Sequence, residues 1–459
     1  MKGLILENLG FQATKEQEKA ATMMAEFMFQ RNGDNIFLLR GYAGTGKTSL
    51  VGALVKTLNQ LKQRVVLMAP TGRAAKVFSL HADQTAYTIH KRIYRQKAFT
   101  GEMVDFLQGV NLLKGALFIV DEASMIANEG SLTSAFGTGC LLDDLIHYVY
   151  SGEGCRLMLV GDTAQLPPVG ETLSPAMEPE MLAGYGMEVI ETELTQVVRQ
   201  EDSSGILYNA TMLRRMIEED DVYALPNLRF NGFADIECIS GADLIEALEQ
   251  AYYHCGIEET TVITRSNTRA NAYNKGIRGR ILCYESELES SDRLMVVKNN
   301  YHWSEFIANG DVAVVRRMYN IREEHGFRFA DAILRFPDFD DEEVEATIIL
   351  DTLASEAPAL SRAQQDALFQ SVWADYPELT TKRERMKAVK ADPFFNALQV
   401  KYAYAVTCHK AQGGQWQQVF IDQGYLTEDM LGPDYYRWLY TAITRATEKV
   451  WMVNWKVEG

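Results

Sequence analysis

The stretch from Gly41 to Thr48 carries the G-x-x-x-x-G-K-[ST] pattern of a phosphate-binding loop, between an apolar run and a segment with helical apolar spacing. Its glycines let the backbone curl, so successive N–H groups can point at phosphate oxygens. Lys47 would reach the β- and γ-phosphates, and the Thr48 hydroxyl would ligate Mg²⁺. The alternative is a glycine-rich turn with a chance lysine. We assign these residues to a nucleoside triphosphate site: Gly41, Ala43, Gly44, Thr45, Gly46, Lys47, Thr48 and Ser49.

Acidic and amide side chains follow two later apolar runs. Asp121 and Glu122 come directly after residues 116–120. Asp121 would hold Mg²⁺, directly or through water, and Glu122 would orient and deprotonate an attacking water. Gln165 follows residues 155–160 and would touch the γ-phosphate and report its loss. A solvated turn is the alternative for both places, but their order after Lys47 favours ATP hydrolysis.

Phosphoryl transfer also needs cations where negative charge develops, and Arg199 and Arg445 are the candidates. An isolated arginine more often forms a surface ion pair. A second α/β domain facing the first would bring Arg445 across a cleft. Nucleotide would then close the two domains, and hydrolysis would release them.

The elements that must position these residues alternate between strands and helices. Apolar runs at 35–40, 65–69, 116–120 and 155–160 each end in a chemical motif, which is typical of a parallel sheet with ligands at the carboxyl ends of its strands. A second α/β pattern starts near residue 200. A hairpin is expected at 95–113. An insertion at about 290–398 should hold a small β-barrel, the acidic run 338–343 and a helical stretch from 361 to about 389.

Composition bounds the class of protein. The chain has 459 residues, with 47% hydrophobic and 23% charged residues, which is ordinary for a globular protein of about three domains. No apolar run approaches the roughly 20 residues that span a bilayer, and the start lacks the length of a signal peptide. We expect a cytoplasmic protein without a membrane partner. Six scattered cysteines without a C-x-x-C pair argue against a zinc site or disulfide framework.

Charge is distributed unevenly along the chain. The net charge of −17 argues against a polyanionic partner. However, residues 260–283 carry five cations and no carboxylate, and residues 64–97 carry seven cations against Asp83 alone. Each stretch is either an ordinary solvated face or part of a groove that binds nucleic acid on an otherwise acidic molecule.

Seven motifs occur in a fixed order, and together they resemble superfamily 1 DNA helicases of the RecD/Dda type, the branch that moves 5′→3′. They lie at 41–48, 70–75, 88–91, 121–125, 161–168, 407–413 and 440–446. The compact length is similar to that of the Dda members. The resemblance implies two RecA-like parallel-sheet domains, at 1–200 and at 201–290 plus 399–459. It also implies a β-hairpin insertion at 92–115 and an SH3-like β-barrel with helices at 291–398.

The resemblance also implies residue roles. Gln17 would read the adenine edge, although its spacing from Thr14 also fits a helix capping box, and it can do both. Gln412 and Gly413 would couple the DNA site to the nucleotide, and Arg199 and Arg445 match the two arginine fingers. The candidate single-strand contacts are Pro70, Thr71, His90, Phe99, Arg265, Asn267, Thr407, His409 and Lys410. Phe99 or Phe106 would be the aromatic at the hairpin tip that stacks on a base pair, with core packing as the alternative.

One position departs from the family pattern. The family often has Ser-Glu after Gln412 and Gly413, where the acid meets the ribose, but this chain has Gly414 and Gln415. Gln415 can still hydrogen-bond a hydroxyl, so we retain it as a nucleotide contact.

The expected function is ATP- and Mg²⁺-dependent unwinding of DNA, moving 5′→3′ on single strands, in replication, recombination or repair. We expect a monomer that binds single-stranded DNA and forks and that works with replication or repair proteins. A phosphate-loop ATPase switch without nucleic acid is the second hypothesis, and it leaves both basic stretches without a role. A non-enzymatic DNA-binding scaffold is the third, and it would need a degraded nucleotide site.

Replacing Lys47 tests the phosphate-binding loop. Lys47→Ala should lower ATP turnover by more than about 100-fold, because the cation at the β- and γ-phosphates is lost. Binding of single-stranded DNA, measured by fluorescence anisotropy, should stay close to wild type. Turnover that survives in Lys47→Ala would mean that another site hydrolyses ATP.

Overall fold

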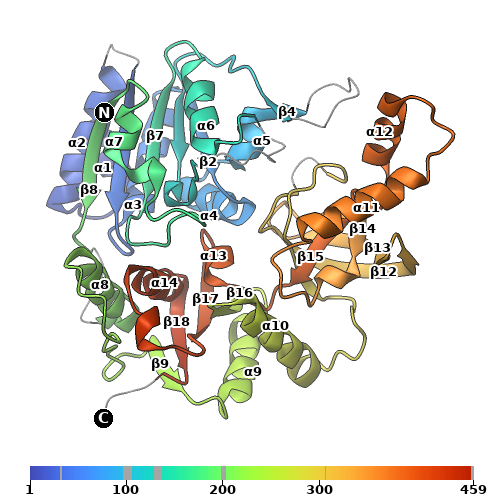
Figure 1. Cartoon of the computed structure of the whole chain (residues 1–459). Coiled ribbons are helices and arrows are strands. Elements are labelled where there is room, and N and C mark those ends of the chain that lie inside the picture. The colour runs from blue at the N-terminus through green and yellow to red at the C-terminus, as the bar shows by residue number, and fades with distance from the viewer. Residues whose placement is uncertain (31–33, 97–105, 129–136, 198–202, 305–306, 456–459) are drawn as a thin grey trace.

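The computed structural model describes the chain except residues 31–33, 97–105, 129–136, 198–202, 305–306 and 456–459. Two parallel sheets lie one above the other in Figure 1, and a closed β-barrel lies beside them. The predicted fold class, two RecA-like α/β parts with a barrel in the second half, is confirmed.

The first sheet has the strand order β3-β2-β6-β7-β1-β8, and every pairing in it is parallel. Its central strands are apolar runs buried on both faces, because helices cover both sides of the sheet. The strands are β1 (Asn35–Gly41), β2 (Val65–Ala69), β3 (Ala86–Thr88), β6 (Leu117–Val120), β7 (Arg156–Gly161) and β8 (Glu188–Leu194). The helices are α1 (Lys2–Leu9), α2 (Lys15–Phe29), α3 (Lys47–Gln60), α4 (Gly72–Ala82), α5 (Ile89–Ile93), α6 (Leu141–Tyr150) and α7 (Pro179–Ala183), with short turns η1 (Ala123–Met125) and η2 (Pro175–Met177).

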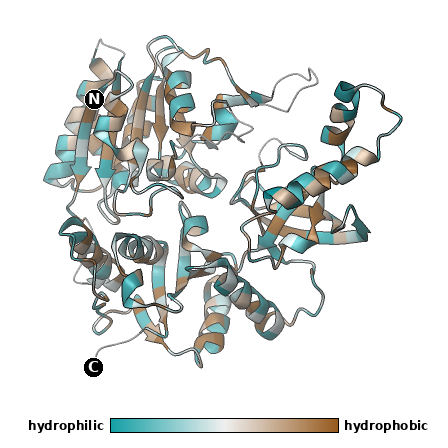
Figure 2. Ribbon diagram, viewed as in Figure 1, coloured by the Kyte–Doolittle hydropathy of each residue, from teal (hydrophilic) through white to brown (hydrophobic). Residues whose placement is uncertain are grey.

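The second sheet is also parallel, in the order β16-β10-β17-β18-β9. Figure 2 shows the strands of both sheets mainly brown and their helices striped, as expected for helices with one face on an apolar core. The strands are β9 (Ile236–Ile239), β10 (Thr260–Thr264), β16 (Ala405–Thr407), β17 (Trp416–Asp422) and β18 (Ala446–Val453). The helices are α8 (Gly205–Glu218), α9 (Leu244–Cys255), α10 (Asn267–Gly276), the π-helical turn η4 (Ile277–Ile281), α13 (Cys408–Ala411), η6 (Glu428–Met430) and α14 (Pro433–Ile443).

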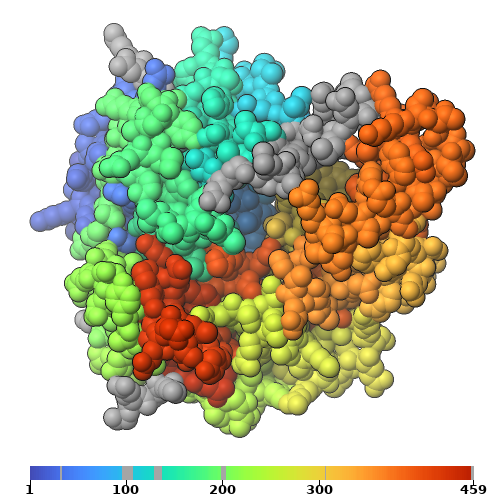
Figure 3. Space-filling model, viewed as in Figure 1, coloured from blue at the N-terminus to red at the C-terminus, as the bar shows by residue number. Residues whose placement is uncertain are grey.

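The insertion forms a closed five-stranded barrel with two helices between its fourth and fifth strands, and Figure 3 shows it in yellow to orange on the right. Its second strand has 13 residues, and the acidic run 338–343 forms the turn between the third and fourth strands and the start of the fourth. The strands are β11 (Arg293–Val296), β12 (Val312–Glu324), β13 (Phe327–Phe336), β14 (Glu342–Ile349) and β15 (Leu398–Tyr402), with the turn η5 (Leu350–Thr352).

The helical stretch expected from residue 361 to about 389 is two helices, α11 (Arg362–Ala374) and α12 (Lys382–Ala391). Pro377 lies between them. Proline has no N–H and disfavours a helical residue before it, so the chain cannot continue as one helix there.

The hairpin expected at 95–113 is present as the antiparallel pair β4 (Tyr94–Gln96) and β5 (Phe106–Gln108). Phe99, the predicted tip aromatic, lies outside the described residues, as does the predicted arginine finger Arg199. Within the described parts of the chain, no helix combines the length and the apolarity that crossing a bilayer requires.

A two-residue connection joins the barrel to the second sheet. Strand β15 ends at Tyr402 and β16 starts at Ala405. Between them, the buried Tyr404 donates its hydroxyl to Asp292 Oδ1 at 2.9 Å, and Asn274 Oδ1 accepts from the Tyr404 and Ala405 N–H groups at 3.0 and 2.8 Å. These bonds fix the direction in which the barrel leaves the sheet.

Phe336 tests the barrel core. Its side chain is fully buried among strand residues, so Phe336→Ala should destabilise the barrel by about 3–5 kcal/mol. Hydrogen exchange of peptides from β12 to β14 should accelerate, while exchange in the first sheet stays unchanged. Tyr253→Ala, at a side chain that is 95% exposed, is the control and should change neither. Unchanged exchange in the barrel of Phe336→Ala would contradict the assigned core.

Candidate functional site

The phosphate-binding loop lies between β1 and α3, as predicted. Gly44 and Gly46 have φ angles of 78° and 79°, which L side chains rarely adopt, and Gly46 caps α3. The α3 N-terminus therefore opens toward the loop with free N–H groups, the arrangement that binds phosphate. A Cβ on Gly41 would lie 3.0 Å from Leu194 O, so the strand also needs glycine there.

Lys47 is held inside the loop. Its Nζ donates to Gly41 O at 2.6 Å and to Tyr42 O at 2.9 Å, and lies 4.0 Å from Asp162 Oδ2. The ammonium group is thus bound by the loop's own carbonyls and by the carboxylate after β7. A phosphate that enters the loop competes with these partners for the same cation.

Two carboxylates end strand β6 at the site. Asp121 Oδ1 accepts from Glu122 N at 2.9 Å, and Glu122 has a φ of 52°, so the chain turns sharply there. Burial, and then the negative charge of Glu122, raise the pKa of Asp121. Burial also raises the pKa of Asp162, against the opposing charge of Lys47. The site is therefore short of positive charge.

These residues fit a magnesium ion. The Asp121 carboxylate and the Thr48 hydroxyl are hard oxygen donors, and the raised pKa of Asp121 marks a place where a cation would be favourable. Among the described residues there is no group of three or more His, Cys, Asp or Glu side chains that could hold a metal. The ion would therefore depend on phosphate oxygens and water for the rest of its ligands, which is usual for Mg²⁺.

Arg445 reaches this cluster from the second sheet. Its NH1 atom lies 3.6 Å from Glu122 Oε1, and the residue is 4% exposed. Its Nε donates to Thr441 O at 3.1 Å, so the end of α14 aims the guanidinium at the first sheet. The two sheets thus meet at the residues predicted to hydrolyse ATP.

Tyr440 makes a second bridge that the sequence analysis missed. Its buried hydroxyl accepts from Ala43 N at 2.9 Å and donates to Asp162 Oδ2 at 2.7 Å. Burial and the charge of Asp162 raise the pKa of this hydroxyl, so it stays protonated. The sequence signal was its place in the motif at 440–446, but nothing local indicates partners 278 and 397 residues away.

Further bonds fasten the loop after β7 to the second sheet. Thr441 Oγ1 accepts from Leu166 N at 2.9 Å, and Gln412 Nε2 donates to Leu166 O at 2.7 Å. Arg437 donates to the Thr163 carbonyl. Within this loop Gln165 is 4% exposed, and its Oε1 has no hydrogen-bond partner among the described residues.

Gln17 has two structural partners. It completes a capping box with Thr14, with bonds of 3.1 and 3.2 Å, and its Nε2 donates to Thr45 O at 3.0 Å. The predicted capping box is confirmed, and the side chain also supports the phosphate-binding loop. Its contact with adenine stays a prediction.

The predicted DNA contacts of the first sheet follow β2 and β3. Thr71 Oγ1 accepts from Ala74 N at 3.2 Å and caps α4, directly after Pro70. His90 is half-buried, its ring centroid lies 5.7 Å from that of Tyr94, and burial lowers its pKa to about 4. His90 is therefore neutral near pH 7 and would contact DNA by hydrogen bonds rather than by charge.

Gly413 from the second sheet packs against the same region. Its φ is 72°, and a Cβ there would lie 2.9 Å from Ala74 Cβ and 3.2 Å from Thr71 Oγ1. Only glycine allows this approach, so the motif at 407–413 directly contacts the start of α4.

In the second sheet, three of the five predicted DNA contacts come together. Asn267, Thr407 and Lys410 line one cavity of about 30 Å³ together with Lys401 of the barrel. His409 is exposed beside them. Arg265 instead stacks on Tyr435 and Trp438, at 5.4 and 6.0 Å from their ring centroids, so its cation is largely used within the protein.

Gln415 is exposed, and its carbonyl accepts from Arg73 NH2 at 2.7 Å. The groove that it lines contains no residue of the phosphate-binding loop, so its contact with ribose stays a prediction. The same groove holds Lys76, whose Nζ lies 3.2 Å from Asp338 Oδ1 of the acidic turn. The acidic run, which had no assigned role, therefore ties the barrel to α4.

Comparisons with known proteins agree with this arrangement. Residues 12–227 match the family described as AAA domain, and residues 402–453 match the UvrD-like helicase C-terminal domain. The chain is 25% identical over 448 residues to the ATP-dependent RecD2 DNA helicase of Deinococcus radiodurans, covering 95% of this chain and 49% of that protein. It is 22% identical to the uncharacterized protein MJ1519 of Methanocaldococcus jannaschii, covering 96% and 38%.

The chain thus spans less than half the length of these two curated relatives. Among solved structures, the Pif1 helicase from Bacteroides in complex with ADP-AlF3 and ssDNA has a TM-score of 0.49 and 16% identity, covering 97% of this chain and 93% of that one.

The bridging hydroxyl of Tyr440 can be tested alone. Tyr440→Phe removes the partner of the Ala43 N–H group and one of the partners of the Asp162 carboxylate, a loss of about 1–3 kcal/mol. We expect the maximal ATPase rate to fall about tenfold, while the melting temperature falls by only a few degrees. Tyr435→Phe on the same helix, which loses only a bond to Gln423, is the matched control. Equal rates for both variants would show that the bridge has no part in turnover.

Proposed function

We propose that this chain is a RecD-like helicase of superfamily 1, an ATP-dependent DNA helicase that moves 5′→3′ on single-stranded DNA. Its matches to the AAA domain and to the UvrD-like helicase C-terminal domain, and its similarity to the RecD2 helicase, support the proposal. The observation that carries the proposal is the ion pair between Arg445 of the second sheet and Glu122 of the first. Arg445 comes from the second sheet and lies beside a carboxylate at the end of a strand of the first. Closure of the two domains around ATP would need an arginine in such a position.

Hydrolysis would use these residues in separate roles. Lys47 leaves the loop carbonyls and binds the phosphate oxygens of ATP. Glu122 orients the attacking water and takes its proton, and Arg445 neutralises the charge that develops on the transferred phosphoryl group. Gln165 and Arg199 are proposed to contact the γ-phosphate. Magnesium bound at Thr48 and Asp121 would supply further positive charge to the phosphates.

Coupling to DNA would run through the contacts between the sheets. The bonds of Leu166 to Thr441 and Gln412 join the γ-phosphate loop to the motif at 407–413. Gly413 of that motif packs on Thr71, a proposed DNA contact. Closure around ATP would therefore shift the DNA-binding parts of the two sheets relative to each other.

The DNA groove is proposed to cross both sheets. Pro70, Thr71 and His90 would hold the strand on the first sheet, and Asn267, Thr407, His409 and Lys410 on the second. Contacts of this kind are mainly to phosphates, so affinity should fall with salt and ignore sequence. Arg265 would contribute less, because aromatic rings already hold it.

The finer assignments complete the proposal. The hairpin would separate the duplex at a fork, with Phe99 or Phe106 stacking on a base pair. Domain boundaries are proposed at residues 200, 290 and 398. The protein would act as a monomer in the cytoplasm, in replication, recombination or repair, with partner proteins from those processes.

DNA dependence of the ATPase is the first test. Turnover should rise at least tenfold with single-stranded DNA, because DNA bound across both sheets favours the closed cleft. Steady-state ATP hydrolysis with and without oligonucleotide measures this. Turnover that DNA does not change would favour the ATPase switch that acts without nucleic acid.

Direction is tested on tailed duplexes. Strand displacement should require a 5′ tail and ATP, and a matched duplex with a 3′ tail should stay intact. Unwinding only from the 3′ tail would reverse the polarity but leave the motor intact.

Lys410 gives a pH dependence. Burial and then the charge of Lys401 lower its pKa to about 8. Phosphate binds the charged form, so DNA affinity should be constant below that pH and fall toward tenfold per unit above it. Lys410→Arg keeps its charge and should remove the fall between pH 8 and 9.5 in an anisotropy titration. The same slope in both proteins would exclude Lys410 from the DNA site.

A further inference from the structure

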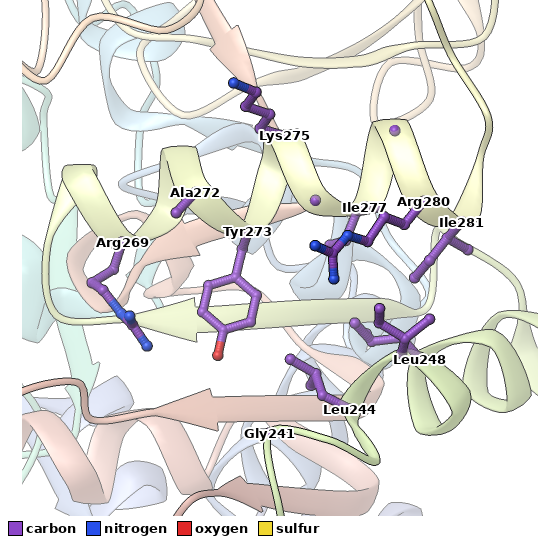
Figure 4. A pocket seen from close by; sticks show the side chains of 13 residues that line it. Gly241, Leu244, Leu248, Arg269, Ala272, Tyr273, Lys275, Ile277, Arg280 and Ile281 are labelled. Atoms are coloured by element: carbon purple, nitrogen blue, oxygen red, sulfur yellow. The ribbon is translucent and has the colours of Figure 1, made fainter.

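A groove of about 700 Å³ lies on the second sheet's helices, between α9 on one side and α10 with η4 on the other. Its apolar surface includes Leu244 and Leu248 of α9 and Ile277 and Ile281 opposite. Figure 4 shows Tyr273 and the Arg280 guanidinium pointing toward Leu244 and Leu248, whereas Lys275 points away. No residue assigned to the nucleotide or DNA site lines it.

The groove collects the cations that remain from the basic stretch 260–283. Arg269 is bonded to Asp422 and Arg278 to Asp292. In the described residues, neither Lys275 nor Arg280 has an ion pair, and both are exposed. All four lie in a chain with a net charge of −17, yet the groove lining includes no carboxylate. An occupant with negative charge would thus meet complementary charge on an apolar floor.

Two glycines keep the groove open. A Cβ added at Gly276 or Gly279 would meet no atom within 4 Å, and neither residue has a positive φ. Their lack of side chains therefore serves no packing or backbone need inside the protein. Gly276 directly precedes the π-helical turn Ile277–Ile281, and Gly279 lies within it. Such turns are rare in proteins, and many of those known lie at functional sites.

We propose that this groove is a docking site for an acidic peptide segment of a partner protein, with leucine or aromatic side chains between its carboxylates. The volume lies in the range of ligand-binding pockets, and a groove between two helices is a common way to hold such a segment. Apolar side chains of the segment cover Leu244, Leu248 and Ile281. Its carboxylates pair with Arg280.

The site is independent of the motor function proposed above. Its lining comes from residues 241–281, and none of the phosphate-binding loop takes part. Occupancy should therefore not require ATP. Variants in the groove should keep the ATPase rate of the wild type.

The test uses an array of synthetic 12-residue peptides with leucine or phenylalanine at every third or fourth position. Asp and Glu, Ser and Gln, or Lys fill the other positions in three matched series. The full chain should bind the acidic series alone, and fluorescence anisotropy with the best peptide should give saturable binding that weakens with salt.

Two variants separate shape from charge. Gly276→Leu fills the groove, and it should also favour the helix, because leucine has the higher helix propensity. Arg280→Glu reverses the central charge. Each should weaken binding by about tenfold or more. Gly3→Leu in α1, where a Cβ also meets no atom, and Arg362→Glu at the start of α11 are the matched controls and should bind as the wild type does.

Several results would overturn the proposal. Equal binding of the acidic and lysine series would remove the charge argument. Binding that Arg280→Glu leaves unchanged would do the same, and would indicate an apolar ligand instead. Binding that Gly276→Leu leaves unchanged, with the fold intact by circular dichroism, would place the peptide elsewhere.

Discussion

The structure depends on buried hydrogen bonds between two sheets that share no strand. The buried hydroxyl of Tyr440 joins the Ala43 N–H group of the first sheet's loop to the Asp162 carboxylate, which also lies near Lys47. Buried polar groups are costly without partners, so the bonds of Tyr440 favour the contact between the two sheets. The ion pair of Arg445 with Glu122 adds charge to the same contact. The proposed nucleotide site is thus formed by residues of both sheets.

Sequence patterns predicted the features that depend on residues close together in the chain. The glycines of the phosphate-binding loop, the apolar runs before Asp121 and Gly161, and the capping box of Thr14 and Gln17 all follow from neighbours in sequence. The break at Pro377 also follows from a single residue in the sequence. The apolar spacing on both sides of it nevertheless predicts one continuous helical stretch. The barrel was expected, but the length of β12 depends on pairing with β13, which no local pattern gives.

Long-range partners account for most of what was missed. Arg265 lies at the end of a strand where a DNA contact is reasonable, but aromatic residues about 170 positions later take its guanidinium. Asp338 was an acidic residue in a run without a role, and it pairs with Lys76 of α4. The sequence shows two stretches rich in cations, at 64–97 and 260–283, but it does not show on which surface each cation lies. Cations of residues 260–283 lie partly in ion pairs and partly in the groove beside α9.

The short connection at Tyr404 has a mechanical consequence. Only two residues separate β15 from β16, and hydrogen bonds from Tyr404 and from the Ala405 N–H group to Asp292 and Asn274 anchor the barrel to the second sheet. The salt bridge between Asp338 of the acidic turn and Lys76 of α4 is a second attachment of the barrel, and the Lys76 side chain is 41% exposed. This contact is the more exposed of the two attachments, so we expect it to open before the connection at Tyr404 does. A force on the barrel would therefore be transmitted to the second sheet. The contact between Asp338 and Lys76 of α4 would be the first to break.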